Sequence, residues 1–388
     1  MKKVILSLAV FSTLLFSCTD DPAINIELPV EVEAPDTYTF NREGESTVSF
    51  GGQTARLEMA ASLMGQLNSE NVLASDLLTM FNDGTGFTAS DDATAEEQAA
   101  VDALNSSGKK LGNKTAAYGD ESVVEDIRGF ITEYADDVST SFSTDAAAGV
   151  AGSHTGTGGR TVRINGKGME LNQVFAKSLI GALVMDQVAY GYLSATKIGD
   201  GVENVALEDG KNYTKMEHHF DEGFGYVYGQ ESDITAAASP AGSGVLFAKY
   251  LKKVNASEEE GIATEIYDAF KMGRAAIVAN DSEIRDAQAE IVKTKMSRVI
   301  LHKAAYYLRG AAAAKATDNY DKADYFHGLS EGYGFVLSLQ FTYDQNGVSY
   351  FSHAEVNTML TALEAGNGFW DITSEEINNM AAEIEAKL

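Results

Sequence analysis

The sequence predicts an all-α protein built as a pair of helical bundles, with one short β-hairpin near its N-terminus. Three observations lead to this fold class. Only one proline, Pro240, occurs between Asp36 and the C-terminus, so long helices can form without interruption. Apolar residues recur with helical spacing over most of the chain. One unit of helix, loop and helix is also repeated later in the sequence.

The composition is that of a folded, acidic protein. The chain of 388 residues holds 57 acidic and 29 basic residues, which gives a formal net charge of −28. This charge argues against binding to nucleic acid or to anionic lipid, since both need a basic surface. The single cysteine excludes a disulfide scaffold, an iron–sulfur site and a thiolate zinc site. We therefore expect an acidic helical protein with no nucleic-acid partner.

Residues 1–18 are predicted to be a lipoprotein signal peptide. Two lysines precede an apolar stretch, residues 4–16, which is too short to span a bilayer comfortably. Ser17 and Cys18 end this stretch in a pattern that resembles a bacterial lipobox. The pattern predicts that Cys18 becomes the lipidated first residue of the mature chain and anchors it to a membrane. The alternative is an ordinary secretory signal with an incidental cysteine.

Residues 19–36 are expected to form an acidic tether, because they contain three of the four prolines and cannot bury themselves. The folded domain is expected to cover residues 37–388. It should open with a hairpin, since alternating apolar residues between Tyr38 and Phe50 flank a polar turn.

The next segments alternate between helices and surface connections. Residues 82–120 are rich in Gly, Asp, Ser and Thr and predict a surface excursion with one short helix, and residues 146–168 predict a glycine-rich connection. On either side of the excursion, apolar residues recur with helical spacing: Leu57, Ala61, Met64 and Leu67, then Val123, Ile127, Phe130, Tyr134 and Val138.

The helix expected over residues 171–197 is apolar on nearly all sides, which is typical of a central, buried helix. Start signals are clear in the second half of the chain, and the helix that begins after Asp281 is expected to reach about residue 316. The three predicted caps are Ser257 with Glu260, Asp281, and Ser352 with Glu355.

The internal repeat relates residues of about 169–229 to residues of about 282–341. Segments 218–227 and 327–336 share the pattern His, three residues, Glu, Gly, aromatic, Gly, aromatic, Val. In the preceding helices, Asp186 and Tyr190 stand where His302 and Tyr306 stand in the second copy. So many matches in one register predict a duplicated helix–loop–helix unit.

The repeated motif places possible metal ligands on one face of a helix. His and Glu four residues apart have Cβ atoms about 5–6 Å apart, so they can share one cation or hydrogen-bond each other. Helical bundles build metal sites from such inward side chains, and imidazole with carboxylate suits zinc or iron. The candidate metal ligands are His218, His219, Glu222 and Asp186 in the first copy, and His327, Glu331 and His302 in the second.

A structural role can explain the same residues. A buried His–Glu pair can tie two helices together without any ligand. Glycine inside a helix costs about 1 kcal/mol, so the motif glycines need a reason, and close approach of a second helix is the usual one.

The chain also resembles a known family. Segments 48–57, 172–177, 179–183 and 218–226 look like an uncharacterised Bacteroidetes lipoprotein family that is related to the imelysin-like helical proteins. The resemblance covers nearly all of the mature chain and implies two helical bundles from an internal duplication. Imelysin-like proteins carry a Gly-x-His-x-x-Glu motif associated with iron uptake and with a debated peptidase activity. His219 and Glu222 match its His and Glu, whereas Glu217 stands at its glycine.

Three functions fit these observations. The first, and the one we expect, is a lipid-anchored cell-envelope protein that binds a metal ion or metal complex, such as zinc or iron, and serves iron acquisition. It would be an outer-membrane lipoprotein facing the periplasm or the cell surface. The second is a metallopeptidase, with Asp221 or Glu222 as general base. The third is an interaction module for a protein or glycan partner, with structural His–Glu pairs and an exposed aromatic patch elsewhere.

Overall fold

Helices make up most of the described chain. The computed structural model describes residues 32–231 and 244–388, and these contain thirteen α-helices and two small antiparallel hairpins. The predicted all-α class with a short N-terminal hairpin is therefore confirmed. Cys18, the predicted signal peptide and the predicted tether up to residue 31 lie outside the described residues.

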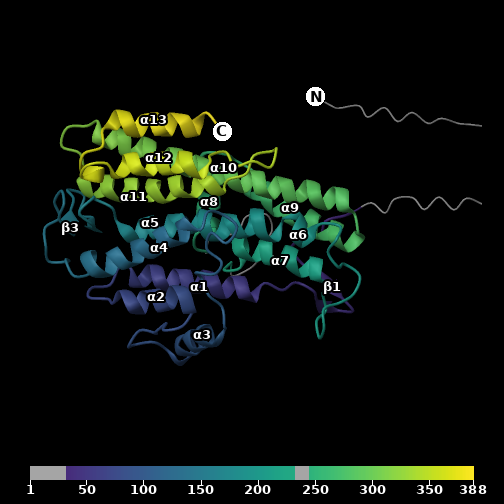
Figure 1. Cartoon of the computed structure of the whole chain (residues 1–388). Coiled ribbons are helices and arrows are strands. Elements are labelled where there is room, and N and C mark those ends of the chain that lie inside the picture. Colours follow the sequence, from purple (N-terminus) through teal and green to yellow (C-terminus); the bar gives the residue numbers. More distant parts are fainter. Residues whose placement is uncertain (1–31, 232–243) are drawn as a thin grey trace, which may run out of the picture. The chain divides into compact units, whose positions relative to one another are not determined.

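The elements follow one another as a hairpin, a run of helices, a second hairpin, and a longer run of helices (Figure 1). Up to the first motif they are β1 (Asn41–Arg42), β2 (Glu45–Ser46), α1 (Gly51–Gln66), α2 (Ala74–Asp83), α3 (Ala95–Ser106), α4 (Ser122–Glu133), π-helical η1 (Tyr134–Val138), β3 (Gly152–Thr155), β4 (Thr161–Ile164), α5 (Leu171–Leu179), π-helical η2 (Ile180–Tyr192), α6 (Ala195–Ile198) and α7 (Lys215–Tyr228). The remainder are α8 (Phe247–Ser257), α9 (Ile262–Ala279), α10 (Ser282–Lys315), α11 (Lys322–Ser338), the 3-10 turn η3 (Leu339–Phe341), α12 (His353–Glu364), the 3-10 turn η4 (Gly368–Trp370) and α13 (Ser374–Glu385).

Two hairpins flank the first helices, and only one of them was predicted. In the first, Asn41 pairs with Ser46 and Arg42 with Glu45, within the predicted segment. In the second, β3 and β4 pair over residues 152–155 and 161–164, where the sequence predicted only a connection. The prediction missed it because just two residues of β4, Val162 and Ile164, alternate as buried apolar residues.

The first hairpin is fixed to the helices by buried charges. The guanidinium of Arg274, on α9, is fully buried and donates to Asp221 at 3.0 Å and to Glu217 at 3.1 Å, both on α7. It also donates to the hydroxyl of Thr47, just after β2, at 3.0 Å. The hydroxyl of Tyr38 donates at 2.8 Å to Oδ1 of Asp221, the same oxygen that accepts from Arg274. The N-terminal hairpin is thus bonded to two helices that lie far away in sequence.

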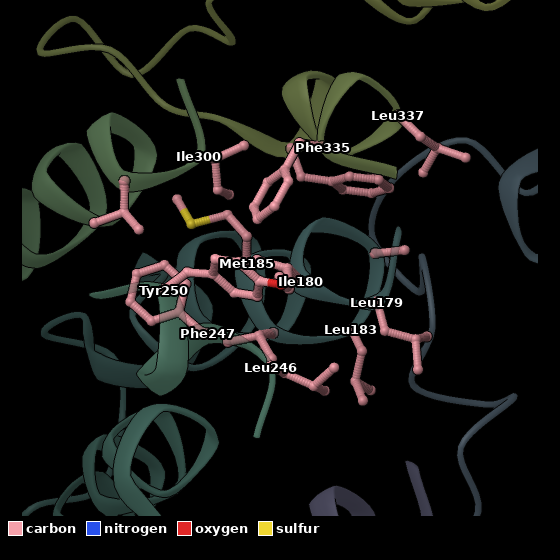
Figure 2. Packing of buried hydrophobic residues seen from close by; sticks show 14 of the residues in the cluster. Leu179, Ile180, Leu183, Met185, Leu246, Phe247, Tyr250, Ile300, Phe335 and Leu337 are labelled. Carbon is pink, nitrogen blue, oxygen red and sulfur yellow. The ribbon is translucent and has the colours of Figure 1, made fainter. Parts of the chain in front are cut away.

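The predicted central helix is confirmed in place and burial but not in length. It runs as α5 and then as a π-helix, η2, which ends at Tyr192 instead of residue 197. The hydroxyl of Ser194 donates back to the carbonyl of Gly191 at 2.6 Å, and the chain turns there into α6. Figure 2 shows Ile180, Leu183 and Met185 of η2 packed among residues of α8, α10 and α11, which include Phe247, Ile300 and Phe335.

Two of the three predicted helix starts are confirmed. Asp281 accepts from the backbone N–H of Ile284, and α10 then runs for 34 residues as expected. The capping box of Ser352 and Glu355 also forms, at the start of α12. The expected start at Ser257 is wrong, because Ser257 ends α8 and the next helix begins at Ile262. The acidic residues after Ser257 instead lie in the loop and bond to α10.

The longest helix, α10, lies at the centre of the second half and packs against α9, α11 and α13. Helix α11 in turn packs against α5 and α12. In the view of Figure 1, α11, α12 and α13 lie toward the top and α1, α2 and α3 toward the bottom. Residues 32–388 form one unit, and it contains both copies of the repeat. Among the described residues, no helix is both long and apolar enough to cross a membrane.

Candidate functional site

The first copy of the motif lies on α7, against the start of α1. The imidazole Nδ1 of His218 lies 3.1 Å from the carbonyl oxygen of Ser49, and Glu222 accepts from the amide of Gln53 at 2.9 Å. A Cβ atom at Gly225 would lie 2.4 Å from the Cβ of Phe50, so only glycine allows this approach. The motif therefore holds α7 against α1.

The second copy lies on α11 and is built in the same way against α5. The Nδ1 of His327 lies 2.6 Å from a carboxylate oxygen of Glu170, just before α5. The carboxylate of Glu331 lies 2.8 Å from the ammonium of Lys177. A Cβ atom at Gly334 would lie 2.5 Å from the Cβ of Lys177. Both copies thus use a histidine, a glutamate and a glycine to join the motif helix to a second helix.

Within each copy, the histidine and glutamate also face each other. The Nε2 of His218 lies 4.0 Å from Glu222, and the Nε2 of His327 lies 3.8 Å from Glu331. Neither distance is short enough for a direct hydrogen bond. Both imidazole side chains are partly exposed, whereas Glu331 is buried.

The other predicted ligands point elsewhere. His219 bonds through Nδ1 to the carbonyl of Lys197 at 2.7 Å, and burial lowers its pKa. The Nε2 of His302 lies 3.1 Å from Glu259. Asp186 accepts from backbone N–H groups of the loop before α4, at Ala117 and Tyr118. In the described part of the chain, no group of three or more His, Cys, Asp and Glu side chains is placed to hold one metal ion.

Two predicted ligands with carboxyl groups, Asp186 and Glu331, have pKa values shifted in opposite directions. Burial raises the pKa of Asp186 to about 6, although Gln187 and three backbone N–H groups donate to its carboxylate. Burial acts in the same direction on Glu331, but the adjacent ammonium of Lys177, together with His327 and Tyr307, outweighs it and brings that pKa down to about 2. Tyr250 adds a hydrogen bond to Glu331 at 2.9 Å. Glu331 is therefore a carboxylate held in place by a buried network.

A groove runs along α10 beside the second copy, and we call it the α10 groove. It has a volume of about 670 Å³ and is bounded by α10, the first turns of α11 and the C-terminal end of α13. The residues that line it are Glu258, His302, Ala305, Tyr306, Tyr307, Arg309, Gly310, Ala311, Ala314, Asp324, Tyr325, Gly328, Glu385 and Leu388.

Two helical glycines in this groove have no protein neighbour that requires them. A Cβ atom at Gly310, in α10, or at Gly328, in α11, would meet nothing within 4 Å. Gly334, farther along α11, is instead crowded by α5. Because glycine inside a helix costs about 1 kcal/mol relative to alanine, Gly310 and Gly328 reduce stability without a packing benefit in the structure. They leave room above the helix backbone.

The corresponding place in the first copy is closed. His219 stands on α7 where Gly328 stands on α11, one residue after the motif histidine in each case. Its ring bonds to α6, and α6 packs against both η2 and α7. In the second copy no such turn occurs, because α10 continues straight to Lys315. The groove is therefore a feature of the second copy.

The α10 groove combines an exposed aromatic ring with charged groups. The side chain of Tyr306 is 56% exposed, and the ammonium of Lys303 lies 4.0 Å from its ring centroid. The rings of Tyr306 and Tyr307 are nearly perpendicular, with centroids 5.3 Å apart. The charged side chains of the groove already have partners in the protein: Arg309 with Glu385 at 2.9 and 2.6 Å, Glu258 with Lys303 at 2.7 Å, His302 with Glu259 at 3.1 Å, and Asp324 with Arg160 at 2.7 Å.

Of the residues that line this groove, only His302 is among the candidate ligands that the sequence predicts. Two signals for the rest were present. Gly310 interrupts an otherwise strong helix-forming stretch. Gly328 stands in the second copy at the position that His219 has in the first. Only the structure shows that both glycines face open space.

Comparison with known proteins gives a family but no relative of known activity. A search of curated proteins and a search of solved structures each found no match. A family model described as "Domain of unknown function (DUF4856)" matches residues 35–388, from the end of the predicted tether to the C-terminus. The chain therefore belongs to the DUF4856 family.

Proposed function

We propose that this protein is a non-catalytic binding module of the cell envelope, which holds its ligand in the α10 groove. The observation that carries the proposal is the open space over Gly310 and Gly328, beside the exposed ring of Tyr306. Pockets for small ligands commonly have volumes of 300–1,000 Å³, and they combine aromatic walls with a few polar groups. The α10 groove has these properties.

The bonds of the motif residues support a binding module over an enzyme. Glu222 and Glu331 bond to a residue of the neighbouring helix, and His218 and His327 bond to a residue just before that helix. A metallopeptidase needs three protein ligands around a metal and a general base beside its bound water. The structural interpretation of the motif accounts for the same side chains without such a centre.

The location rests on the sequence of the first eighteen residues. A lipid on Cys18 would make the protein an outer-membrane lipoprotein that faces the periplasm or the cell surface. The proposed relationship to the imelysin-like proteins rests on the quoted segments and on the repeat. It would explain why both motif helices pack in the same manner.

A thermal-shift screen of the whole protein in detergent tests the binding function. The library would contain small organic molecules, peptides and glycans, and wild type would be compared with Gly328→Leu, which fills the groove. Gly65→Leu is the matched control, because Gly65 is also helical and open but lies on α1. A compound of this groove stabilises wild type and the control but not Gly328→Leu. If every hit also stabilises Gly328→Leu, the groove is not the binding site.

A metal ion or metal complex at the His–Glu pairs is a second candidate. It is favoured by the way each imidazole is held: Nδ1 of His218 lies against a carbonyl and Nδ1 of His327 against a carboxylate. Metal-binding histidines are usually oriented by such a bond, which leaves Nε2 for the metal. Each pair would supply one nitrogen and one oxygen to zinc or iron, and a metal complex could bring the remaining ligands. Such a site would fit a part in iron acquisition.

Metal content decides this second candidate. The whole protein, purified without chelators and then exposed to zinc or iron, would be compared with the double variant His218→Ala/Glu222→Ala. Near-stoichiometric metal that is lost in the variant, with unchanged helical circular dichroism, would support the site. Metal-free protein in both cases, with a lower melting temperature in the variant, would leave the pair a purely structural role.

A further inference from the structure

We infer that the ligand of the α10 groove is an uncharged oligosaccharide. This inference rests on the proposed function and adds the chemical class of the ligand. Three properties of the groove lead to it: its charged groups are already paired, its aromatic ring is exposed, and its floor is open at two glycines.

The charge pairs disfavour an ionic ligand. The pairs of Glu258 with Lys303 and of His302 with Glu259 are mostly shielded from solvent, so an incoming ion would have to break an existing bond to gain one. An uncharged hydroxyl can instead bond to a carboxylate or guanidinium that keeps its partner, since these groups offer several acceptor or donor positions. The paired groups can therefore bind sugar hydroxyls without separating.

The same groups disfavour a purely apolar ligand. A lipid tail in this groove would cover Arg309, Glu385 and Asp324 without offering them hydrogen bonds, and burying such groups is costly. A sugar ring has an apolar face of C–H groups and an edge of hydroxyls. The exposed ring of Tyr306 can take the apolar face, while the hydroxyl edge meets the ion pairs.

The floor of the groove leaves room for a ring of the ligand close to the helix backbone. Gly310 and Gly328 have no side chain, so a ring can approach the backbone of α10 and α11 closely. Lining residues extend along α10 from His302 to Ala314, a distance of about 18 Å at 1.5 Å per residue. This length fits several linked sugar units better than one.

Isothermal titration calorimetry of the whole protein in detergent tests the inference. The uncharged probes are maltohexaose, cellohexaose and mannohexaose; the charged probes are hexagalacturonate and a chitosan hexamer. We expect at least one uncharged probe to bind. Tyr306→Ala should weaken it about tenfold, and Gly328→Leu should abolish it. Tyr118→Ala, which removes an exposed tyrosine outside the groove, and Gly65→Leu should leave the affinity unchanged.

The outcomes separate the ligand class from the proposed function. If only charged probes bind, and Gly328→Leu abolishes their binding, the uncharged class is wrong while the groove remains the binding site. If no hexasaccharide binds at millimolar concentration, the oligosaccharide inference is overturned, and the thermal-shift screen still decides the binding function. Binding of an uncharged probe that persists in Gly328→Leu would overturn both the ligand assignment and the groove.

Discussion

The two copies of the repeat share a plan of packing but differ in what lies above it. In each, a motif helix is joined to a second helix by a histidine, a glutamate and a close-packed glycine. In the first copy, His219 bonds to α6, which covers this part of the motif helix. In the second copy, the equivalent position is Gly328, and the α10 groove lies open above it. In both copies the motif therefore joins two helices, and the copies differ at Gly328, which has no side chain where the first copy has His219.

The largest expected effect concerns a network that only the first copy has. Arg274 pairs with Glu217 and Asp221 of α7, whereas Phe326 and Ser330 stand at the corresponding positions of α11. Arg274→Met would leave the fully buried carboxylate of Asp221 without its cation, whereas Glu217 would keep its ion pair with Arg42. We expect a loss of about 3–5 kcal/mol in the free energy of unfolding, measured with urea.

The control for this prediction is Arg298→Met, which breaks a more exposed pair with Glu259 and should cost about 1 kcal/mol or less. The double variant Arg274→Met/Asp221→Asn should recover part of the loss, because one unpaired charge is removed. Equal effects of the two single variants would mean that burial of Arg274 does not matter.

The second prediction tests the glycines that the two copies share. Gly225→Ala and Gly334→Ala each place a Cβ atom within 2.5 Å of a neighbouring helix, and at Gly334 backbone atoms of α5 also stand in the way. We expect each to lower the free energy of unfolding by about 3 kcal/mol, since overpacking of this kind costs about 1–3 kcal/mol or more. Urea unfolding measures both. A loss below about 0.5 kcal/mol, the usual size of the effect of a surface substitution, would show that the helices can simply move apart.

The third prediction compares the stability that the motif glutamates Glu331 and Glu222 contribute at different pH values. The pKa of Glu331 is about 2 in the folded protein, below its ordinary value of 4.5, so its ion pair stabilises the fold fully above pH 4.5. That contribution is lost as the pH falls toward 2. Glu331→Gln should therefore cost about 2–3 kcal/mol at neutral pH and progressively less below pH 4.

Glu222→Gln is the matched change in the first copy. Glu222 bonds to the neutral amide of Gln53 instead of to an ammonium, so its replacement should cost less at neutral pH. Chemical unfolding of both variants between pH 3 and pH 8 makes the comparison. A cost for Glu331→Gln that does not change with pH would contradict the proposed role of Lys177.

The smallest expected effect is that of a substitution in the α10 groove, and this one should increase the stability of the fold. Gly328→Ala adds a methyl group to a helix where nothing lies within 4 Å, so it should raise the free energy of unfolding by about 0.5–1 kcal/mol. Thermal unfolding would detect this as a small increase in melting temperature. A decrease would mean that the backbone of Gly328 needs a conformation that alanine disfavours.

The sequence was a good guide to features that depend on local chemistry. The start of α10 at Asp281, the first hairpin and the two motif helices all follow from spacing and capping residues. The bonding partners of the motif could not be predicted in this way. Ser49 and Lys177 lie far from His218 and Glu331 in the sequence, and only the folded chain brings them together.

The groove lay beyond sequence reasoning for a related reason. A helical glycine is explained by a neighbour that comes close or by a space that must stay empty, and the sequence looks the same in both cases. Gly334 and Gly328 are six residues apart on one helix and illustrate the two cases. The change from α to π geometry at Ile180 likewise has no signal in the apolar pattern that we can identify.

The buried guanidinium of Arg274 has a mechanical consequence. It ties the segment around Thr47 to α7 and α9, and Tyr38 is bonded to the same carboxylate. If a lipid on Cys18 holds the protein to a membrane, any force along the chain reaches these bonds before it reaches the helices. This force is then shared among the hydrogen bonds that Arg274 and Tyr38 make around Asp221.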